Sequence, residues 1–306
     1  MATIEVEGLT KEFGETRAID DLHFEVTSGE IFGYLGPNGA GKTTTIRTLL
    51  GFLNPTGGTA TVLGQDIRNE RALNEAKRDI GYLPGELSFE SGVTGREFLE
   101  LQGALKGDSR LDEMTDIFTP PLDRKIREYS SGNRQMLGLI QTFMHDPDLV
   151  IMDEPTRGLD PLMQERLNTF LRKERDAGVT ILFSSHVLGE VRRVCDRVGI
   201  IRNGEIVALE DIEALLKKGG KRVRVHTEEP ITDDAFDVEG VIEFEQVGRE
   251  ARFTFAGDYN ELLERLAPYT LIDMEIEEPP LEEVFMHFYG TDPAEETANA
   301  GQKSDE

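Results

Sequence analysis

The stretch Gly36-Pro37-Asn38-Gly39-Ala40-Gly41-Lys42-Thr43-Thr44 fits the spacing G-x-x-x-x-G-K-[ST] and decides how the rest of the chain is interpreted. It follows the apolar run Ile31-Phe32-Gly33-Tyr34-Leu35, which predicts a buried strand, and residues 45–50 can continue it as a helix. Glycines let successive backbone N–H groups point at one place, and the helix start adds partial positive charge there. Lys42 adds a full charge, and Thr43 offers a hydroxyl to Mg²⁺. The stretch therefore predicts a site for the phosphates of a nucleoside triphosphate.

A second chemical feature is a strand that ends in two acids. Four consecutive apolar residues, 149–152, lead into Asp153 and Glu154, which predicts a central parallel strand whose carboxyl end faces the ligand. Asp153 can hold Mg²⁺ beside Thr43, and Glu154 can orient and deprotonate a water molecule. The next apolar run, 179–183, leads to His186, which is a candidate sensor of the γ-phosphate.

Length and composition are typical of a globular protein. The chain has 306 residues, enough for one large and one small domain, with 30% charged and 38% hydrophobic residues. It contains no run of about 18 apolar residues, so no membrane span is expected. Residues 1–5 lack the features of a signal peptide, and a single cysteine, Cys195, excludes internal disulfides and a cysteine metal cluster. We therefore expect a cytoplasmic location.

The net charge is −26, from 33 basic and 59 acidic residues. Such a surface repels phosphate backbones, so nucleic acid is not expected as a partner. About ten of the 33 basic residues are Lys, and the acid excess runs along the whole chain. Both features favour a halophile cytosol, where high salt screens the self-repulsion. An ordinary acidic protein with an acidic tail is the alternative.

Local patterns predict the remaining elements of the first 219 residues. Alternating residues predict strands at 3–7 and 22–26, with Phe13 in a loop at 11–14 where its ring can stack on a purine. A capping box at Thr94 opens a mainly helical insertion over about 91–135. Asn203-Gly204 predicts a hairpin turn.

A second, smaller domain is expected after the glycine pair 219–220. Strands at 222–227, 241–246, 251–255 and 270–276, with a helix at 259–266 and a short one at 232–237, follow a ferredoxin-like βαββαβ order over residues 220–290. An amphipathic helix is expected at 281–289. The polar, acidic residues 291–306 are predicted to be disordered.

In sequence order, these motifs make residues 1–220 resemble the ATPase subunits of ATP-binding-cassette (ABC) transporters, of the exporter type. The resemblance implies an α/β fold with a P-loop NTPase core and a helical insertion, plus a small α+β C-terminal domain. Residues 36–44 resemble Walker A, and residues 150–154 resemble Walker B with the catalytic glutamate. His186 resembles the switch histidine, Asp160 lies in a D-loop-like Gly-Leu-Asp, and Phe13 takes the place of the adenine-stacking aromatic. The residues that resemble the signature motif are Ser130, Ser131, Gly132 and Asn133.

Two departures from the family pattern stand out. Tyr129, Ser131 and Asn133 replace three residues of the usual L-S-G-G-Q, but Ser130 and Gly132 are kept. The Q-loop glutamine is replaced by Gly85, which cannot ligate a metal, and Glu86 is a candidate substitute.

The resemblance implies ATP and Mg²⁺ as cofactors, with Lys42, Glu154 and His186 as catalytic residues. It also implies a head-to-tail pair of copies, in which the signature of one completes the ATP site of the other. A separate membrane permease, docked near residues 85–94, would hold the pair at the inner face of the membrane. A soluble, non-transport ABC ATPase and an ATP-gated interaction module with weak turnover are the alternatives. The C-terminal domain resembles the accessory domain of exporter subunits and can equally serve dimerisation or regulation.

Overall fold

The computed structural model describes residues 2–212, 214, 220–229, 236 and 240–277. The chain divides into two compact units, Met1–Glu210 and Asp211–Glu306. The predicted boundary at Gly219, the helix at 281–289 and the tail from 291 lie outside the described residues, as does most of the helix expected at 212–218.

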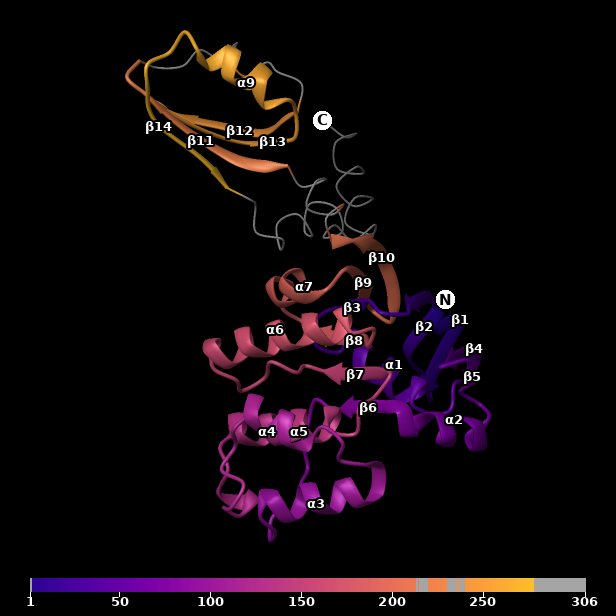
Figure 1. The fold of residues 1–306 in the computed structure, drawn as a ribbon. Helices are drawn as coiled ribbons and strands as arrows, with labels where there is room; N and C mark the ends of the chain where they lie inside the picture. The colour runs from indigo at the N-terminus through magenta and orange to yellow at the C-terminus, as the bar shows by residue number, and fades with distance from the viewer. Residues whose placement is uncertain (1, 213, 215–219, 230–235, 237–239, 278–306) are drawn as a thin grey trace. The chain divides into compact units, whose positions relative to one another are not determined.

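A six-stranded sheet forms the centre of the first unit, in the order β10-β9-β3-β8-β7-β6 (Figure 1). Its strands are β3 (Ile31–Leu35), β6 (Ile80–Leu83), β7 (Leu149–Asp153), β8 (Thr180–Ser185), β9 (Arg197–Arg202) and β10 (Glu205–Asp211). The strands from β9 to β6 pair in parallel. Every residue of β3, β7 and β8 is buried, because both faces of the sheet are covered and the strands are therefore continuous apolar runs. The predicted Asn203-Gly204 hairpin joins β9 to β10, with φ of 51° and 87°.

A second sheet of the same unit is antiparallel, in the order β2-β1-β4-β5. It contains β1 (Ala2–Phe13), β2 (Thr16–Thr27), β4 (Gly57–Val62) and β5 (Gln65–Asp66). The prediction of a loop at 11–14 was wrong, because the β1–β2 pairing continues through several register shifts up to Phe13 and Thr16. Phe24 of this sheet lies against Phe32 and Tyr34 of β3, with ring centroids 5.7 and 5.5 Å apart. These rings help to join the two sheets into one core.

Helices complete the first unit and include the predicted helical insertion. Around the sheets lie α1 (Lys42–Leu49), α2 (Glu70–Ala76), the 3₁₀ helix η1 (Lys77–Asp79), α6 (Pro161–Asp176) and α7 (Leu188–Val194). The insertion contains α3 (Gly95–Lys106), α4 (Leu111–Ile117), η2 (Ile126–Glu128) and the start of α5 (Ser131–Phe143). Thr94 and Glu97 form the predicted capping box. The helices α3 and α4 pack on α5, which itself packs on β6 at the edge of the main sheet.

The second unit contains a four-stranded antiparallel sheet in the order β12-β13-β11-β14. Its elements are β11 (Lys221–Thr227), β12 (Val241–Val247), β13 (Glu250–Phe255), α9 (Tyr259–Leu266) and β14 (Leu271–Glu277). Numbered within the unit, this order is 2-3-1-4. The ferredoxin-like βαββαβ order stays a prediction. The short helix expected at 232–237 lies outside the described residues except for Phe236, which packs in the core with Phe253 and Leu262.

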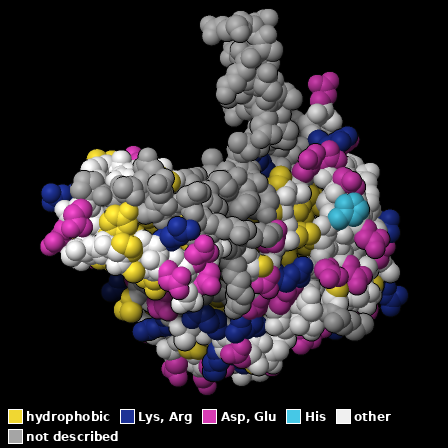
Figure 2. Space-filling model, turned by 90° about the horizontal axis from the view of Figure 1, so that it is seen from above, with side chains coloured by type: hydrophobic (Ala, Val, Ile, Leu, Met, Phe, Trp, Pro, Cys, Tyr) yellow, Lys and Arg dark blue, Asp and Glu magenta, His cyan; other side chains and the backbone are white. Residues whose placement is uncertain are grey.

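The surface is rich in carboxylates. Asp and Glu side chains are spread over the face shown in Figure 2, and Lys and Arg side chains lie among them. In the part of the chain that the structure describes, no helix is long and apolar enough to cross a membrane.

Candidate nucleotide-binding site

The loop between β3 and α1 depends on its glycines for its shape. Gly39 and Gly41 have φ of 84° and 113°, which residues with a side chain rarely adopt. A Cβ on Gly41 would lie 2.7 Å from the carbonyl oxygen of Ala18, and one on Gly36 would lie 2.4 Å from that of Ile201. The neighbouring strands therefore leave no room for side chains there. The loop ends at the N-terminus of α1, where backbone N–H groups can receive an anion.

Lys42, the first residue of α1, is held by the loop that it follows. Its ammonium donates to the carbonyl oxygens of Gly36 at 2.6 Å and Pro37 at 3.2 Å, and lies 3.7 Å from Oε1 of Glu154. Burial lowers the pKa of Lys42, while Glu154 and Asp153 act in the opposite direction. A buried cation is thus fixed at the mouth of the loop, where phosphate oxygens would meet it.

Asp153 ends β7 and accepts two hydroxyl groups. Thr43 Oγ1 donates to Oδ2 at 2.6 Å and Ser184 Oγ donates to Oδ1 at 2.5 Å. The carboxylate is almost fully buried. Thr43 and Asp153, predicted to share a metal ion, therefore lie side by side and offer the hard oxygen donors that Mg²⁺ prefers. Ser184 was not among the predicted site residues, although it lies two residues before His186 in the sequence.

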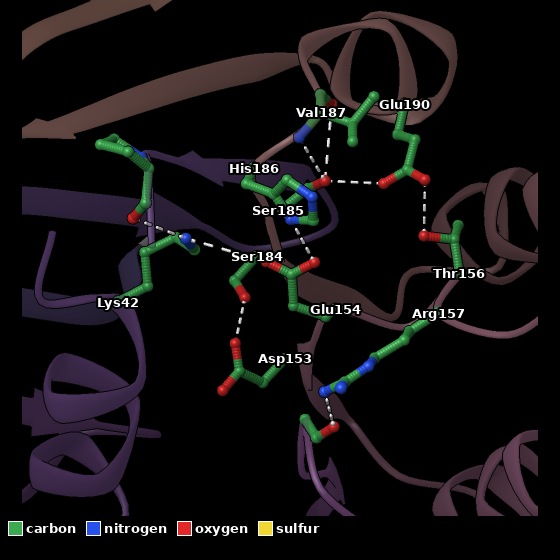
Figure 3. Close-up of polar contacts among 12 residues, drawn as sticks. Lys42, Asp153, Glu154, Thr156, Arg157, Ser184, Ser185, His186, Val187 and Glu190 are labelled. Carbon is green, nitrogen blue, oxygen red and sulfur yellow. Dashed lines mark hydrogen bonds and ion pairs between the residues drawn. The ribbon is translucent and has the colours of Figure 1, made fainter. Parts of the chain in front are cut away.

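Glu154 and His186 meet just beyond the paired ends of β7 and β8. The register of these strands sets Asp153 opposite Ser184, and the Glu154 N–H donates to the carbonyl oxygen of Ser184 at 3.1 Å. His186 Nδ1 is 2.6 Å from Glu154 Oε2 (Figure 3). Glu154 has a φ of 55°, an unfavourable value for a residue with a side chain, as is common at functional sites. Two of the three predicted catalytic residues, Glu154 and His186, are therefore in contact, and the third, Lys42, approaches the other oxygen of Glu154.

These groups line one cavity of about 810 Å³. Most residues of the phosphate-binding loop line it, together with Asp153, Glu154 and His186. Sequence interpretation missed several other lining residues: Ala18, Arg47, Tyr82, Thr156, Arg157, Gln164 and Glu190. Most of these come from elements far from the loop in sequence, so no local pattern identified them. Arg157 was the easiest to find, since it lies in the short stretch between Glu154 and Asp160.

The segment around Gly85 adjoins the Asp153 carboxylate. A Cβ on Gly85 would lie 3.2 Å from Oδ2 of Asp153, so the backbone passes close to the proposed metal ligand. Arg157 Nη1 donates to the Gly85 carbonyl oxygen at 3.3 Å, and Glu86 lines the cavity. Gly85, which stands where the family pattern has a glutamine, therefore lies beside the site with its backbone and offers no side chain.

Comparison with known proteins identifies the family. A family model described as ABC transporter matches residues 19–157. YhcH of Bacillus subtilis (strain 168), an uncharacterized ABC transporter ATP-binding protein, is 37% identical over 218 residues, which cover 69% of this chain and 70% of YhcH. The chain belongs to the ABC transporter ATP-binding proteins. Members of this family are ATP-hydrolysing subunits, so the chain is an ABC ATPase that binds ATP.

Other ABC proteins show the same likeness. The daunorubicin/doxorubicin resistance ATP-binding protein DrrA of Streptomyces peucetius is 37% identical over 234 residues, covering 73% of this chain and 70% of DrrA. A solved structure of the ATP binding subunit of an ABC transporter superposes with a TM-score of 0.64 at 28% identity, covering 70% of this chain and 91% of that one. The fold predicted from the motifs, an ABC ATPase core, is thereby confirmed.

The ABC signature residues do not line the cavity, although Gly132 lies against Gly158, which does. Ser130 caps α5 by accepting the N–H of Asn133 at 3.2 Å. Gly132 lies against Gly158, whose carbonyl oxygen would be 2.8 Å from a Cβ at 132. None of the residues 130–133 is among the described residues that line the cavity. Within one chain, therefore, the structure does not bring the signature to the phosphate-binding loop.

Two further predicted residues have local roles in the single chain. Asp160 caps α6, accepting the N–H of Met163 at 2.9 Å, and it does not line the cavity. Phe13 is 48% exposed at the end of β1, with the Lys11 ammonium 5.0 Å from its ring centroid, and it too is outside the lining. Its stacking on adenine remains a prediction.

Proposed function

We propose that this protein is the motor subunit of an ABC exporter, working as a pair of identical chains bound to a separate membrane permease. The observation that carries the proposal is the cluster of Lys42, Thr43, Asp153, Glu154 and His186 around one cavity. Each hydrogen-bonds to, or lies close to, another member of the cluster, so the groups support one another's positions. Preorganised charges and dipoles of this kind are the main source of catalysis in phosphoryl transfer.

In the proposed reaction, the phosphate-binding loop and Lys42 would hold the β- and γ-phosphates, and Thr43 with Asp153 would hold Mg²⁺. The metal ion would neutralise charge that develops on the phosphate oxygens. Glu154 would orient the attacking water and accept its proton. We propose that His186, whose Nδ1 contacts Glu154, holds that side chain and contacts the γ-phosphate.

The proposal of a pair rests on the position of the signature. Ser130, Ser131, Gly132 and Asn133 form the exposed or half-exposed start of α5 and are absent from the described lining of their own chain's cavity. An exposed helix N-terminus with a hydroxyl group suits the γ-phosphate of ATP bound to a second copy. A head-to-tail pair would supply it to both sites at once.

The proposal of a membrane permease rests on family membership, since the relatives carry the name of transporter ATP-binding proteins. Residues 85–94 are our proposed docking segment. None of them is buried, and they connect the cavity wall at Gly85 to the capping box that opens α3. A permease bound there would contact the nucleotide site and the helical insertion together. The name of DrrA, a drug-resistance protein, supports export as the direction.

The proposed roles can be tested with Glu154→Gln. This variant keeps the size of the side chain and removes its ability to accept a proton, so we expect unchanged ATP affinity, no turnover and an ATP-dependent dimer. Phosphate release and light scattering after gel filtration measure these outcomes. Wild-type turnover in the variant would refute the assignment of Glu154. A wild-type protein that binds ATP without releasing phosphate would favour an ATP-gated interaction module.

A second experiment separates the transporter from a soluble ABC ATPase. Affinity purification of the chain from detergent-solubilised membranes should recover a partner with several membrane spans. Recovery of ribosomal or other nucleic-acid complexes in its place would contradict the transporter proposal.

A further inference from the structure

Glu190 of α7 connects the two loops that carry Glu154 and His186. Its carboxylate oxygens accept hydrogen bonds from Thr156 Oγ1 and from Ser185 Oγ, each at 2.6 Å (Figure 3). Thr156 is two residues after Glu154, and Ser185 directly precedes His186. One side chain therefore bridges both halves of the Glu154–His186 contact.

The two hydrogen bonds are short and well shielded. Thr156 is 5% exposed and Ser185 is fully buried, so water competes little for either hydroxyl group. Hydrogen bonds to an ionised carboxylate are shorter and stronger than those between neutral groups. Ser185 Oγ also accepts the N–H of Val187 at 2.9 Å, which extends the connection to the residue after His186.

Backbone pairing holds Ser185 opposite Leu35 of β3, but the β7–β8 ladder does not reach the turn that contains Thr156. The ladder between β7 and β8 ends at Asp153 and Ser184, and the Glu154 N–H makes the last hydrogen bond across it. Glu154 then turns away with a φ of 55°, a conformation that persists only where the surroundings enforce it. Gln135 holds the far side of this turn by donating to the Pro155 carbonyl oxygen at 2.8 Å. Glu190 supplies the link on the side that faces His186.

We propose that Glu190 is a positioning residue for ATP hydrolysis, which holds the loops of Glu154 and His186 in register so that the two side chains meet. The inference rests on the roles proposed above for those two residues. Glu190 acts through them and is not assigned to any contact with the reacting atoms. Because phosphates are held by the loop at Gly36–Thr44, loss of Glu190 should impair turnover and spare ATP binding.

The test is steady-state ATP hydrolysis by Glu190→Ala, Glu190→Gln and a control, Glu165→Ala, which removes an exposed carboxylate of α6 outside the cavity. A displacement of about 1 Å at a catalytic group typically lowers the rate about a hundredfold, so we expect Glu190→Ala to lower kcat by roughly ten- to a hundredfold with KM unchanged. Glu190→Gln, which can still accept one hydrogen bond, should lie between the wild type and Glu190→Ala. The control should match the wild type.

A double-mutant cycle distinguishes positioning from a general structural defect. In a His186→Ala background there is no imidazole for Glu190 to position, so adding Glu190→Ala should lower kcat by at most about a further threefold. The proposal would be overturned if Glu190→Ala lowered kcat as much in the His186→Ala variant as in the wild type. It would also be overturned if Glu190→Ala alone kept the kcat of the wild type. If Glu190→Ala fails to fold, Thr156→Val removes one of the two bonds and should lower kcat severalfold, and unchanged kcat would again overturn it. Glu154→Gln keeps the two proposals separate. If Glu154→Gln is inactive and Glu190→Ala is fully active, only the proposed role of Glu190 is refuted. If Glu154→Gln is itself active, the assignment of the catalytic site is refuted.

Discussion

Replacing Arg110 with Ala should destabilise the protein more than the removal of an exposed ion pair. Arg110 precedes α4 in the helical insertion, and its guanidinium donates to both oxygens of Glu174 in α6, at 2.6 and 2.7 Å. Glu174 is 2% exposed, so the substitution leaves a buried carboxylate without its partner. Breaking such a pair from one side typically costs about 3–5 kcal/mol in the free energy of unfolding. Glu113 also loses a partner, but it is 39% exposed and should add less than about 1 kcal/mol.

Urea unfolding followed by circular dichroism measures this loss against a matched control. Arg96→Ala also removes an arginine of the helical insertion, but its partner Asp123 is 83% exposed, so we expect a loss of at most about 1 kcal/mol. In the double variant Arg110→Met/Glu174→Leu both charges are gone, and stability should return to near that of the wild type. Equal losses for Arg110→Ala and Arg96→Ala would show that burial of Glu174 does not make its pair with Arg110 important for stability.

Two further predictions concern protons and salt. Burial lowers the pKa of Lys42 below 10.5, and only the protonated form attracts phosphate, so ATP affinity should begin to fall at a lower pH than for an ordinary lysine. Titration with a fluorescent ATP analogue at rising pH measures this, and an affinity that stays constant up to pH 10.5 would contradict it. If the charge of −26 reflects a halophile cytosol, melting curves should shift upward with KCl as the self-repulsion is screened, whereas lower stability above molar salt would refute that origin.

The sequence predicted those parts of the fold that depend on interactions between residues close together in the chain. The glycines at 36, 39 and 41 are required by the loop's own backbone and its close neighbours, and Asn203-Gly204 is required by a two-residue hairpin turn. Two strands of the second unit were also predictable, since β11 and β13 alternate between a core face and an open face. The ends of β1 and β2 were not, because their length depends on pairing with each other across register shifts.

Some residues of the candidate site could be predicted from sequence motifs, and others could not. Lys42, Thr43, Asp153 and Glu154 lie in motifs whose spacing reflects chemistry at one place. Glu190 lies in a helix with no motif of its own, and its importance appears only when α7 folds back beside the turn that contains Thr156. Its role comes from tertiary contacts, which cannot be predicted from the periodicity of the sequence or from the spacing of motifs.

We propose that one chain's signature completes the other chain's ATP site, and mixing two inactive variants tests this pairing. Lys42→Ala disables the phosphate-binding loop. Ser130→Asp keeps α5 capped, since Asp is a good N-cap, but sets a negative charge toward the γ-phosphate. Each variant alone should be inactive. A mixed pair contains one intact site, so an equimolar mixture should recover about a quarter of wild-type phosphate release if pairing is random. A mixture as inactive as its two components, despite dimers containing both variants, would contradict the account.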